Sequence, residues 1–311
     1  MGTPEFAVES LRKLLVEGYN VVGVVTAPDK PSGRGQQLSE SAVKKYAIAN
    51  GLKLLQPEKL KASDFLNELE TLKADLQIVV AFRMLPVEVW NMPPLGTFNL
   101  HASLLPKYRG AAPLNWAIIN GEKESGVTTF KLQHEIDTGS IIFQEKVDID
   151  DNDDVEILHD KLILIGAELV LKTVDALAEG NVEYISQEYF INKGIEPCAA
   201  PKIFKEDCMI NWEKDSISIK NLVRGLSPYP AAWTILKDKS IESQYNVKIF
   251  SVGNEIVNDS IEPGQIFSDG KKYLKFRCED GYIYIKELQF PGKKRMLIDE
   301  FLRGFQISKF I

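Results

Sequence analysis

The chain has 311 residues, a formal net charge of −7 and a hydrophobic share of 44%, which allows two domains that each bury a core. Its three cysteines, Cys198, Cys208 and Cys278, have no C-x-x-C spacing, and its three histidines are scattered, so we expect reduced thiols and neither a disulfide framework nor a metal site. No apolar run reaches membrane-spanning length and no signal-peptide pattern opens the chain, so we expect a cytoplasmic protein without membrane contact.

Helix and strand patterns alternate over residues 1–180, which is typical of a largely parallel sheet with crossover helices. We predict Thr3 as the N-cap and Pro4 as the first residue of a helix that ends near Leu15. The patterns that follow predict strands at 21–26, 76–81, 97–100, 126–132 and 141–147, and helices at 42–50, 64–72, 112–120 and 155–178.

The start of the chain is unusual for such a domain, which ordinarily opens with a strand. Here Met1-Gly2-Thr3-Pro4 already forms the turn before the first helix. A central strand supplies hydrogen bonds to two neighbours and apolar cover beneath the helices. We therefore expect the native gene product to begin several residues upstream with a short apolar, β-branched run, and Met1 to be an internal methionine.

A change of pattern near residue 190 separates the two domains. Residues 190–206 contain Gly194, Pro197 and Pro201 without apolar periodicity, which is typical of a linker. A short helix at 217–225 and short strands at 233–236, 247–252, 273–278 and 282–288 follow, and this spacing predicts a small β-barrel. The predicted division is a catalytic domain at 1–189, a linker at 190–206 and a barrel domain at 207–311.

Three polar residues suggest acyl-transfer chemistry. Asn99 and His101 stand two positions apart at the end of a predicted strand, and Asp137 opens the sequence Asp-Thr-Gly further along. The strand spacing points Asn99 and His101 to one side, and ligands of open α/β sheets bind at the carboxyl ends of strands. An amide donor, a titratable ring and a carboxylate suit acyl transfer. Taken singly, each residue also has a structural explanation, as a turn residue, a strand-end histidine and an Asx turn.

Several segments, in order along the chain, match one family. The matching segments are 1–7, 29–35, 101–106, 108–113, 137–139, 200–202, 226–233 and 299–304. Together they resemble the methionyl-tRNA formyltransferase family, and the resemblance covers nearly the whole chain. The formyltransferase motifs mark the superfamily, whereas the loop at 29–35 and the C-terminal half narrow it to the tRNA enzymes.

The resemblance implies an α/β fold, with a Rossmann-like, mostly parallel formyltransferase domain followed by an OB-like β-barrel that binds tRNA. It also implies transfer of the formyl group of 10-formyltetrahydrofolate, the co-substrate, to the α-amine of methionine on initiator tRNA, for translation initiation. We expect a monomer that needs neither a metal nor a covalent intermediate.

The same resemblance assigns roles to individual residues. Asn99 would donate to the oxyanion, an effect worth about 3–4 kcal/mol when one such donor is lost elsewhere. His101 would donate to the same oxygen, while Asp137 would orient the ring and accept the amine proton through a water. We expect His101 and Asp137 to be solvent-accessible.

Two further groups of residues follow from the resemblance. The segment matched to folate binding is Ser103, Leu104, Leu105 and Pro106, an apolar wall in a proline-fixed loop, although Leu104 and Leu105 fit a core plug equally well. The residues matched to tRNA binding are Arg34, between two glycines, and the basic run Lys293, Lys294 and Arg295. A solvated surface remains the simpler explanation for each basic cluster taken alone.

Other functions remain open. Formyltransferases that act on an amino sugar nucleotide or on glycinamide ribonucleotide would carry the same Asn, His and Asp, and only the basic loop and the barrel favour tRNA. A non-catalytic RNA-binding protein would use the barrel alone, but the three polar residues argue against it. A dinucleotide-dependent dehydrogenase is disfavoured because no G-x-G-x-x-G opens the first helix.

Overall fold

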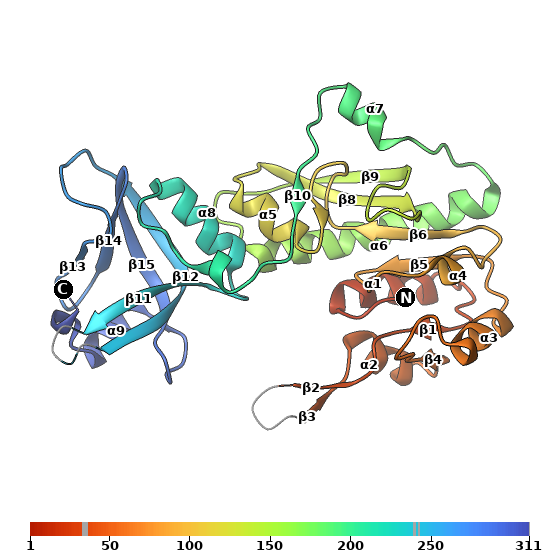
Figure 1. The fold of residues 1–311 in the computed structure, drawn as a ribbon, viewed down its shortest axis with the longest axis horizontal. Helices are drawn as coiled ribbons and strands as arrows, with labels where there is room; N and C mark the ends of the chain where they lie inside the picture. The colour runs from red at the N-terminus through yellow and green to blue at the C-terminus, as the bar shows by residue number, and fades with distance from the viewer. Residues whose placement is uncertain (33–36, 239–240, 242, 311) are drawn as a thin grey trace. The chain divides into compact units, whose positions relative to one another are not determined.

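The computed structural model describes residues 1–32, 37–238, 241 and 243–310 (Figure 1). The chain divides into two compact units. The first consists of 1–111, 124–147 and 159–200, and the second of 112–123, 148–158 and the residues from 201 onward. The second unit therefore includes two segments that precede the predicted linker in the sequence.

The first unit is an α/β structure, as predicted. Its helices are α1 (Glu5–Val16), α2 (Ala42–Ala49), α3 (Ser63–Thr71), α4 (Val87–Trp90), α6 (Val155–Glu179, which begins in the second unit) and α7 (Gln187–Asn192). Its main strands are β1 (Val24–Val25), β4 (Leu54–Leu55), β5 (Gln77–Val80), β6 (Thr97–His101), β8 (Glu124–Lys131) and β9 (Ile141–Asp148). Strands β1 and β4 pair in parallel, as do β5 and β6, whereas β8 pairs antiparallel with β6 and continues the sheet to β9.

Two smaller pairs of strands and two element boundaries were not predicted. Strands β2 (Lys30–Ser32) and β3 (Gln37–Ser39) form an antiparallel pair, while β7 (Arg109–Gly110) and β10 (Ala199–Ala200) pair in parallel. Helix α1 begins one residue later than predicted because Pro4, with an extended backbone, is its N-cap. The predicted linker at 190–206 holds the end of α7 as well as β10.

The two faces of β6 have different neighbours. A Cβ added to Gly166 of α6 would lie 3.0 Å from Leu100 Cδ2, so α6 packs closely on one face, along β6 and β8 (Figure 1). On the other face, Val79 of β5 joins a buried apolar cluster with α3 and α4. Because Val79 pairs with Asn99 and side chains alternate along a strand, Asn99 and His101 face away from α6.

Met1 and Gly2 lie between β1 and β5. Gly2 N–H donates to Val25 O at 3.0 Å, and Val80 N–H donates to Met1 O at 2.9 Å, so these two residues link β1 to β5. The α-amine of Met1 donates to Ile78 O at 2.6 Å, and burial lowers the pKa of this ammonium to about 5. Beside it is a cavity of about 680 Å³.

The second unit contains a curled antiparallel sheet. Its strands are β11 (Ala232–Asp238), β12 (Ser243–Ile256), β13 (Ile266–Ser268), β14 (Leu274–Cys278), β15 (Gly281–Gln289) and β16 (Met296–Leu297). They pair in the order β11-β12-β15-β14-β13, with β16 on β15. Its helical segments are α5 (Pro113–Ile119), η1 (Glu206–Cys208), α8 (Ser216–Leu226), α9 (Ile298–Gly304) and η2 (Ile307–Lys309). The patterns predicted the longer strands and α8 but missed α9, which buries Phe301 and Leu302 in the core of this unit.

Polar contacts tie the early segments of the second unit to α8. Arg224 of α8 is 8% exposed, and its Nη1 donates to Asp150 O and Asp153 O, both at 3.1 Å. Asn115 Nδ2 of α5 donates to Gly225 O at 2.8 Å. A Cβ on Gly225 would lie 2.6 Å from Ile119 Cγ1, so α5 and α8 approach each other at a point where only a glycine fits.

Candidate active site

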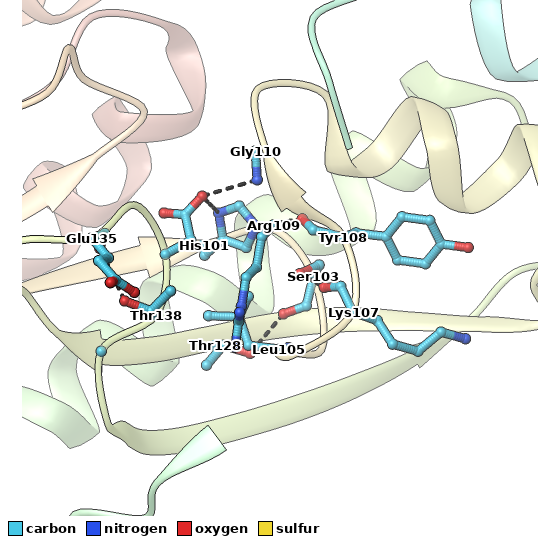
Figure 2. A network of polar contacts seen from close by, with 12 residues as sticks. His101, Ser103, Leu105, Lys107, Tyr108, Arg109, Gly110, Thr128, Glu135 and Thr138 are labelled. Atoms are coloured by element: carbon cyan, nitrogen blue, oxygen red, sulfur yellow. Dashed lines mark hydrogen bonds and ion pairs between the residues drawn. The ribbon is translucent and has the colours of Figure 1, made fainter. Parts of the chain in front are cut away.

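His101, the last residue of β6, has its ring fixed by the loop that follows. Its Nε2 lies 2.8 Å from Tyr108 O (Figure 2). Because a carbonyl oxygen only accepts, Nε2 carries the hydrogen in this contact. The other ring nitrogen, Nδ1, faces Asp137 Oδ2 at 3.9 Å, which is beyond hydrogen-bond distance.

Asp137 is held from outside its own turn. Its Oδ2 accepts a hydrogen bond from Gly110 N at 3.0 Å, and its backbone has a φ of +54°, which is uncommon for a residue other than glycine. The side chains of His101 and Asp137 are only 8% and 14% exposed. The expectation of solvent access was therefore wrong for His101, whose ring is bound by the loop at 108–110, whereas Asp137 is half-buried and keeps a small exposed area.

The position of Gly110 depends on its lack of a side chain. Its φ is +129°, and a Cβ here would lie 2.5 Å from Ala200 O. Strand β10 runs parallel to β7 at this point, so the close pairing of two short strands aims the Gly110 amide at Asp137. The loop belongs to the matched segment 108–113 of the sequence, but its partner strand β10 was not predicted.

Asn99 precedes Leu100 in β6 and is half-buried. It pairs across the sheet with Phe130, whose ring also makes an edge contact with the His101 imidazole. The predicted strand is thus confirmed. Asn99 and His101 lie on one face of β6 near its carboxyl end, and Asp137 lies opposite His101.

The segment Ser103–Pro106 is fixed by its own polar contacts. Ser103 Oγ donates to Lys107 O at 2.7 Å, and Thr128 Oγ1 donates to Ser103 O at 2.6 Å (Figure 2). Leu105 is 1% exposed and packs with Phe130 and Ile141 in a small core cluster. Pro106 is also buried, whereas Leu104 is half-buried.

Of the four basic residues matched to tRNA binding, the structure describes three. Arg34 lies outside the described residues. Lys293, Lys294 and Arg295 are exposed in the second unit. Arg295 forms a two-pronged contact with Glu287, at 2.6 Å from both Nε and Nη2, and its guanidinium lies 4.4 Å from the centre of the Phe250 ring.

One buried residue beside this site had no signal in the sequence. Gln187, at the start of α7, is 3% exposed. It contacts the main chain of the Asp137 turn and the side chain of Arg109. A glutamine next to a predicted linker has no distinguishing pattern, so its position could be found only in three dimensions.

Two negative findings concern the described part of the chain. No group of three or more His, Cys, Asp or Glu residues there could hold a metal ion. Within the same ranges, no helix is both long and apolar enough to cross a membrane. Cys198, Cys208 and Cys278 are free in the structure.

Two family models match the sequence: "Formyl transferase" over residues 1–174 and "Formyl transferase, C-terminal domain" over 202–306. A protein from Bacteroides thetaiotaomicron named methionyl-tRNA formyltransferase is 56% identical, over 99% of this chain and 95% of its own. One of the same name from Flavobacterium johnsoniae is 52% identical, over 99% and 96%.

Solved structures share the fold at lower identity. An N-formyltransferase from Helicobacter canadensis, in complex with folinic acid and dTDP-3-aminofucose, superposes with a TM-score of 0.66 at 23% identity, over 95% of this chain and 97% of that one. Glycinamide ribonucleotide transformylase 1 from Symbiobacterium toebii has a TM-score of 0.51 at 19% identity, over 60% and 92%. On the sequence matches to both of its halves, this chain belongs to the formyl transferase family.

Proposed function

We propose that this protein transfers the formyl group of 10-formyltetrahydrofolate to the α-amine of methionine carried by initiator tRNA, and so acts in translation initiation. The observation that carries this proposal is the 52–56% identity to methionyl-tRNA formyltransferases over nearly the full length of both chains. The grouping of Asn99, His101 and Asp137 at the end of β6 supports it.

The reaction needs an acceptor amine that is neutral, a donor for the growing negative charge and a route for one proton. The amine lone pair forms the new C–N bond, and the formyl C=O electron pair moves to oxygen. Collapse of the intermediate then breaks the bond to the folate nitrogen, which leaves with a proton. In our proposal Asn99 donates to the oxyanion, and Asp137 receives the amine proton through a water.

The geometry narrows the role of His101 to one atom. Its Nε2–H is engaged by Tyr108 O, so Nδ1 is the nitrogen that would face the oxyanion, and it donates a hydrogen bond there only when the ring is protonated as an imidazolium. The 3.9 Å between Nδ1 and Asp137 Oδ2 is wide for a direct hydrogen bond, and a substrate atom or a water can make contact with both groups. This arrangement needs no metal ligand from the protein.

For the folate we propose contacts from the segment Ser103, Leu104, Leu105 and Pro106. Leu104 supports this best among the four because it is half-buried, whereas Leu105 packs in the core. We propose that Leu104 contacts the pterin ring and that Leu105 supports the loop from beneath.

For the tRNA we propose contacts from Arg34 and from Lys293, Lys294 and Arg295. The proposed contacts of Lys293, Lys294 and Arg295 rest on the exposure of these residues in the second unit. For the antiparallel sheet of that unit we propose an OB-like barrel. The division into a catalytic domain at 1–189, a linker at 190–206 and a tRNA-binding domain at 207–311 is part of this proposal. So are a monomeric state and a cytoplasmic location.

An amino sugar nucleotide is the second candidate acceptor. The observation that favours it is the fold similarity to the Helicobacter canadensis N-formyltransferase, with a TM-score of 0.66. At 23% identity this likeness reaches only the fold, and the 56% identity to the tRNA enzymes carries more weight.

The deciding experiment incubates the purified protein with 10-formyltetrahydrofolate and one acceptor at a time. The acceptors are charged initiator tRNA, charged elongator methionine tRNA, free methionine and a dTDP-amino sugar. We expect formylation of the initiator tRNA to be fastest, and its rate to fall with salt because phosphate contacts release counterions. Preferential formylation of the sugar nucleotide would overturn the proposed acceptor.

A variant separates the tRNA contact from the chemistry. We expect Arg34→Ala to raise KM for charged tRNA while KM for the folate is unchanged, because the loop is proposed to contact RNA alone. Lys45→Ala, at an exposed position of helix α2, is the matched control for the loss of one positive charge. Equal losses in the two variants would contradict a specific role of Arg34.

A further inference from the structure

Gln187 lies beside the proposed site at the carboxyl end of β6 but is not one of its three residues. It is the first residue of α7, whose N-cap is the Ser186 side chain, which accepts from Glu188 N. Just before it, Ile185 pairs with Ile141 of β9. This pairing fixes the start of α7 next to the turn that contains Asp137.

All hydrogen-bonding positions of the Gln187 amide are used. Its Nε2 donates to Asp137 O at 2.8 Å and to Gly139 O at 2.9 Å. Its Oε1 accepts from Arg109 Nε at 2.9 Å and from Nη2 at 2.6 Å. A primary amide has two N–H donors and two lone pairs on oxygen, so this buried side chain has no polar group left for another partner.

These contacts close a ring through the proposed acid–base residue. Gln187 holds the main chain of Asp137 on one side and the Arg109 side chain on the other. The next residue after Arg109 is Gly110, whose N–H donates to Asp137 Oδ2 at 3.0 Å. The same glutamine therefore fixes both the backbone that carries the carboxylate and the strand that donates to it.

The turn needs such support because its backbone is unusual. Asp137 has a φ of +54°, in the left-handed region that a residue with a side chain adopts only where surrounding contacts hold it there. A Cβ on Gly139 would lie 1.7 Å from Lys131 O, so the turn is also pressed against β8. Without the two Gln187 bonds, the carbonyls of residues 137 and 139 would be left without these donors.

We propose that Gln187 is a positioning residue for formyl transfer, acting through the Asp137 turn and Arg109 to keep the Asp137 carboxylate facing His101 Nδ1. This inference rests on the proposed function of Asp137. Because the Gln187 side chain is buried and its amide is engaged by protein groups, we expect it to touch neither substrate, and its loss to lower kcat while both KM values stay nearly unchanged. A residue that served stability alone would lower the melting temperature without changing the active site.

Two substitutions divide the contacts of the amide. Gln187→Met keeps the approximate length and removes every hydrogen bond. Gln187→Glu keeps an acceptor for Arg109 but replaces the N–H donors by oxygens that repel the two carbonyls. Gln133→Ala is the matched control, because exposed Gln133 also bonds the same turn, through Thr138 Oγ1 at 2.9 Å, but does not reach the Asp137 main chain.

We expect both Gln187 variants to lower kcat by about tenfold to a hundredfold, because a displacement of about 1 Å can cost this much. Gln133→Ala should stay within about twofold of the parent enzyme in kcat. Unchanged kcat in Gln187→Met, with a lowered melting temperature, would overturn the proposal, and so would full activity in Gln187→Glu.

The second readout does not depend on activity. Labelling with ¹³C-carbonyl arginine and ¹⁵N-glycine selects the four Arg–Gly pairs of the chain, at Arg34, Arg109, Arg224 and Arg303. Asp137→Asn identifies the Gly110 signal, since it changes the acceptor of that amide. We expect the Gly110 amide to shift in both Gln187 variants and to stay in place in Gln133→Ala. An unshifted Gly110 amide in Gln187→Met would overturn the proposal.

Asp137→Asn also separates the two levels of the argument. If it retains activity, Asp137 has no part in the reaction, and the inference about Gln187 fails with that assignment. If it loses activity while Gln187→Met keeps it, the proposed function stands and only the inference about Gln187 is wrong.

Discussion

At the carboxyl end of β6, polar groups from four segments satisfy one another, whereas the space between β1 and β5 is bordered mainly by apolar side chains around a cavity of about 680 Å³. Both regions belong to the same unit. In the first region, His101, Asp137 and Gly110 have fixed hydrogen-bond partners, and a substitution there should change the rate of formyl transfer. In the second, Leu14, Val24 and Leu72 line the cavity, and a substitution there should alter the free energy of unfolding.

The largest effect should come from the polar region. We expect Asp137→Asn and His101→Gln each to lower kcat/KM by about 10²–10³-fold, with little change in melting temperature, because both substitutions conserve volume. His159→Gln is the matched control, since His159 also faces an aspartate, Asp160, at 3.2 Å, but at an exposed position. Near-normal activity in Asp137→Asn or His101→Gln would show that the substituted residue has no part in the reaction.

A second pair of variants compares, within the polar region, a residue of a buried cluster with its neighbour that is proposed to contact the folate. Leu105→Ala should lower the free energy of unfolding by about 2–5 kcal/mol, because it opens a cavity in a buried cluster. Leu104→Ala should cost less stability and raise KM for the folate. Chemical unfolding and folate kinetics on both variants measure this, and the opposite pattern would assign the folate contact to Leu105.

The third prediction concerns the buried ammonium of Met1. Its pKa is about 5 in the folded chain against 8.0 for an ordinary N-terminus, so between these values the unfolded chain binds more protons. Stability should therefore fall by up to roughly 4 kcal/mol as the pH drops from 8 to 5. An extension ahead of Met1 replaces the ammonium by an amide and should remove this dependence.

The composition of the extension separates charge from packing. Lys-Ile-Val-Phe ahead of Met1 should also fill part of the cavity and raise the melting temperature at every pH. Gly-Ser-Gly-Ser should remove the pH dependence alone. Intact mass confirms each N-terminus, and equal melting temperatures for the two extensions would show that the apolar border adds nothing.

The smallest effect should come from one hydroxyl in the wall of the cavity. Ser10 Oγ is buried and has no hydrogen-bond partner among the described residues. We expect Ser10→Ala to stabilise the protein by about 1 kcal/mol, or roughly 2–4 °C in melting temperature. Ser41→Ala should have the opposite sign, because the Ser41 hydroxyl caps α2 at Lys44 N. A loss of stability in Ser10→Ala would contradict the prediction.

The sequence predicted those parts of the fold that depend on local pattern. Helix α6 and strand β6 follow from apolar periodicity and were placed to within a residue or so. The two-residue strands β7 and β10 were not predicted, because their pairing joins residues about ninety positions apart and leaves no local pattern. Helix α1 begins at Glu5 and not at Pro4, a difference decided by the backbone of one proline.

The site divides in the same way. Asn99, His101 and Asp137 were proposed as site residues from residue type and from matching segments, although the exposure of His101 was overestimated. The path of the loop at 108–110 depends on the close contact between Gly110 and Ala200. These residues are far apart in the sequence, so no local pattern predicts their contact. Gln187 donates to main-chain carbonyl oxygens of the Asp137 turn. Every residue carries such an oxygen, so the sequence gives no sign of this contact.

The Arg224 contacts have a consequence for recombining such proteins. Because this guanidinium is inside the second unit and is satisfied by the carbonyls of Asp150 and Asp153, the C-terminal segment is not a self-sufficient cassette. A graft that begins at residue 207 would carry the arginine into a new host without its acceptors, and α8 without α5 against Gly225. Exchange between relatives therefore has to transplant 112–123 and 148–158 as well, because this compact unit is discontinuous along the gene.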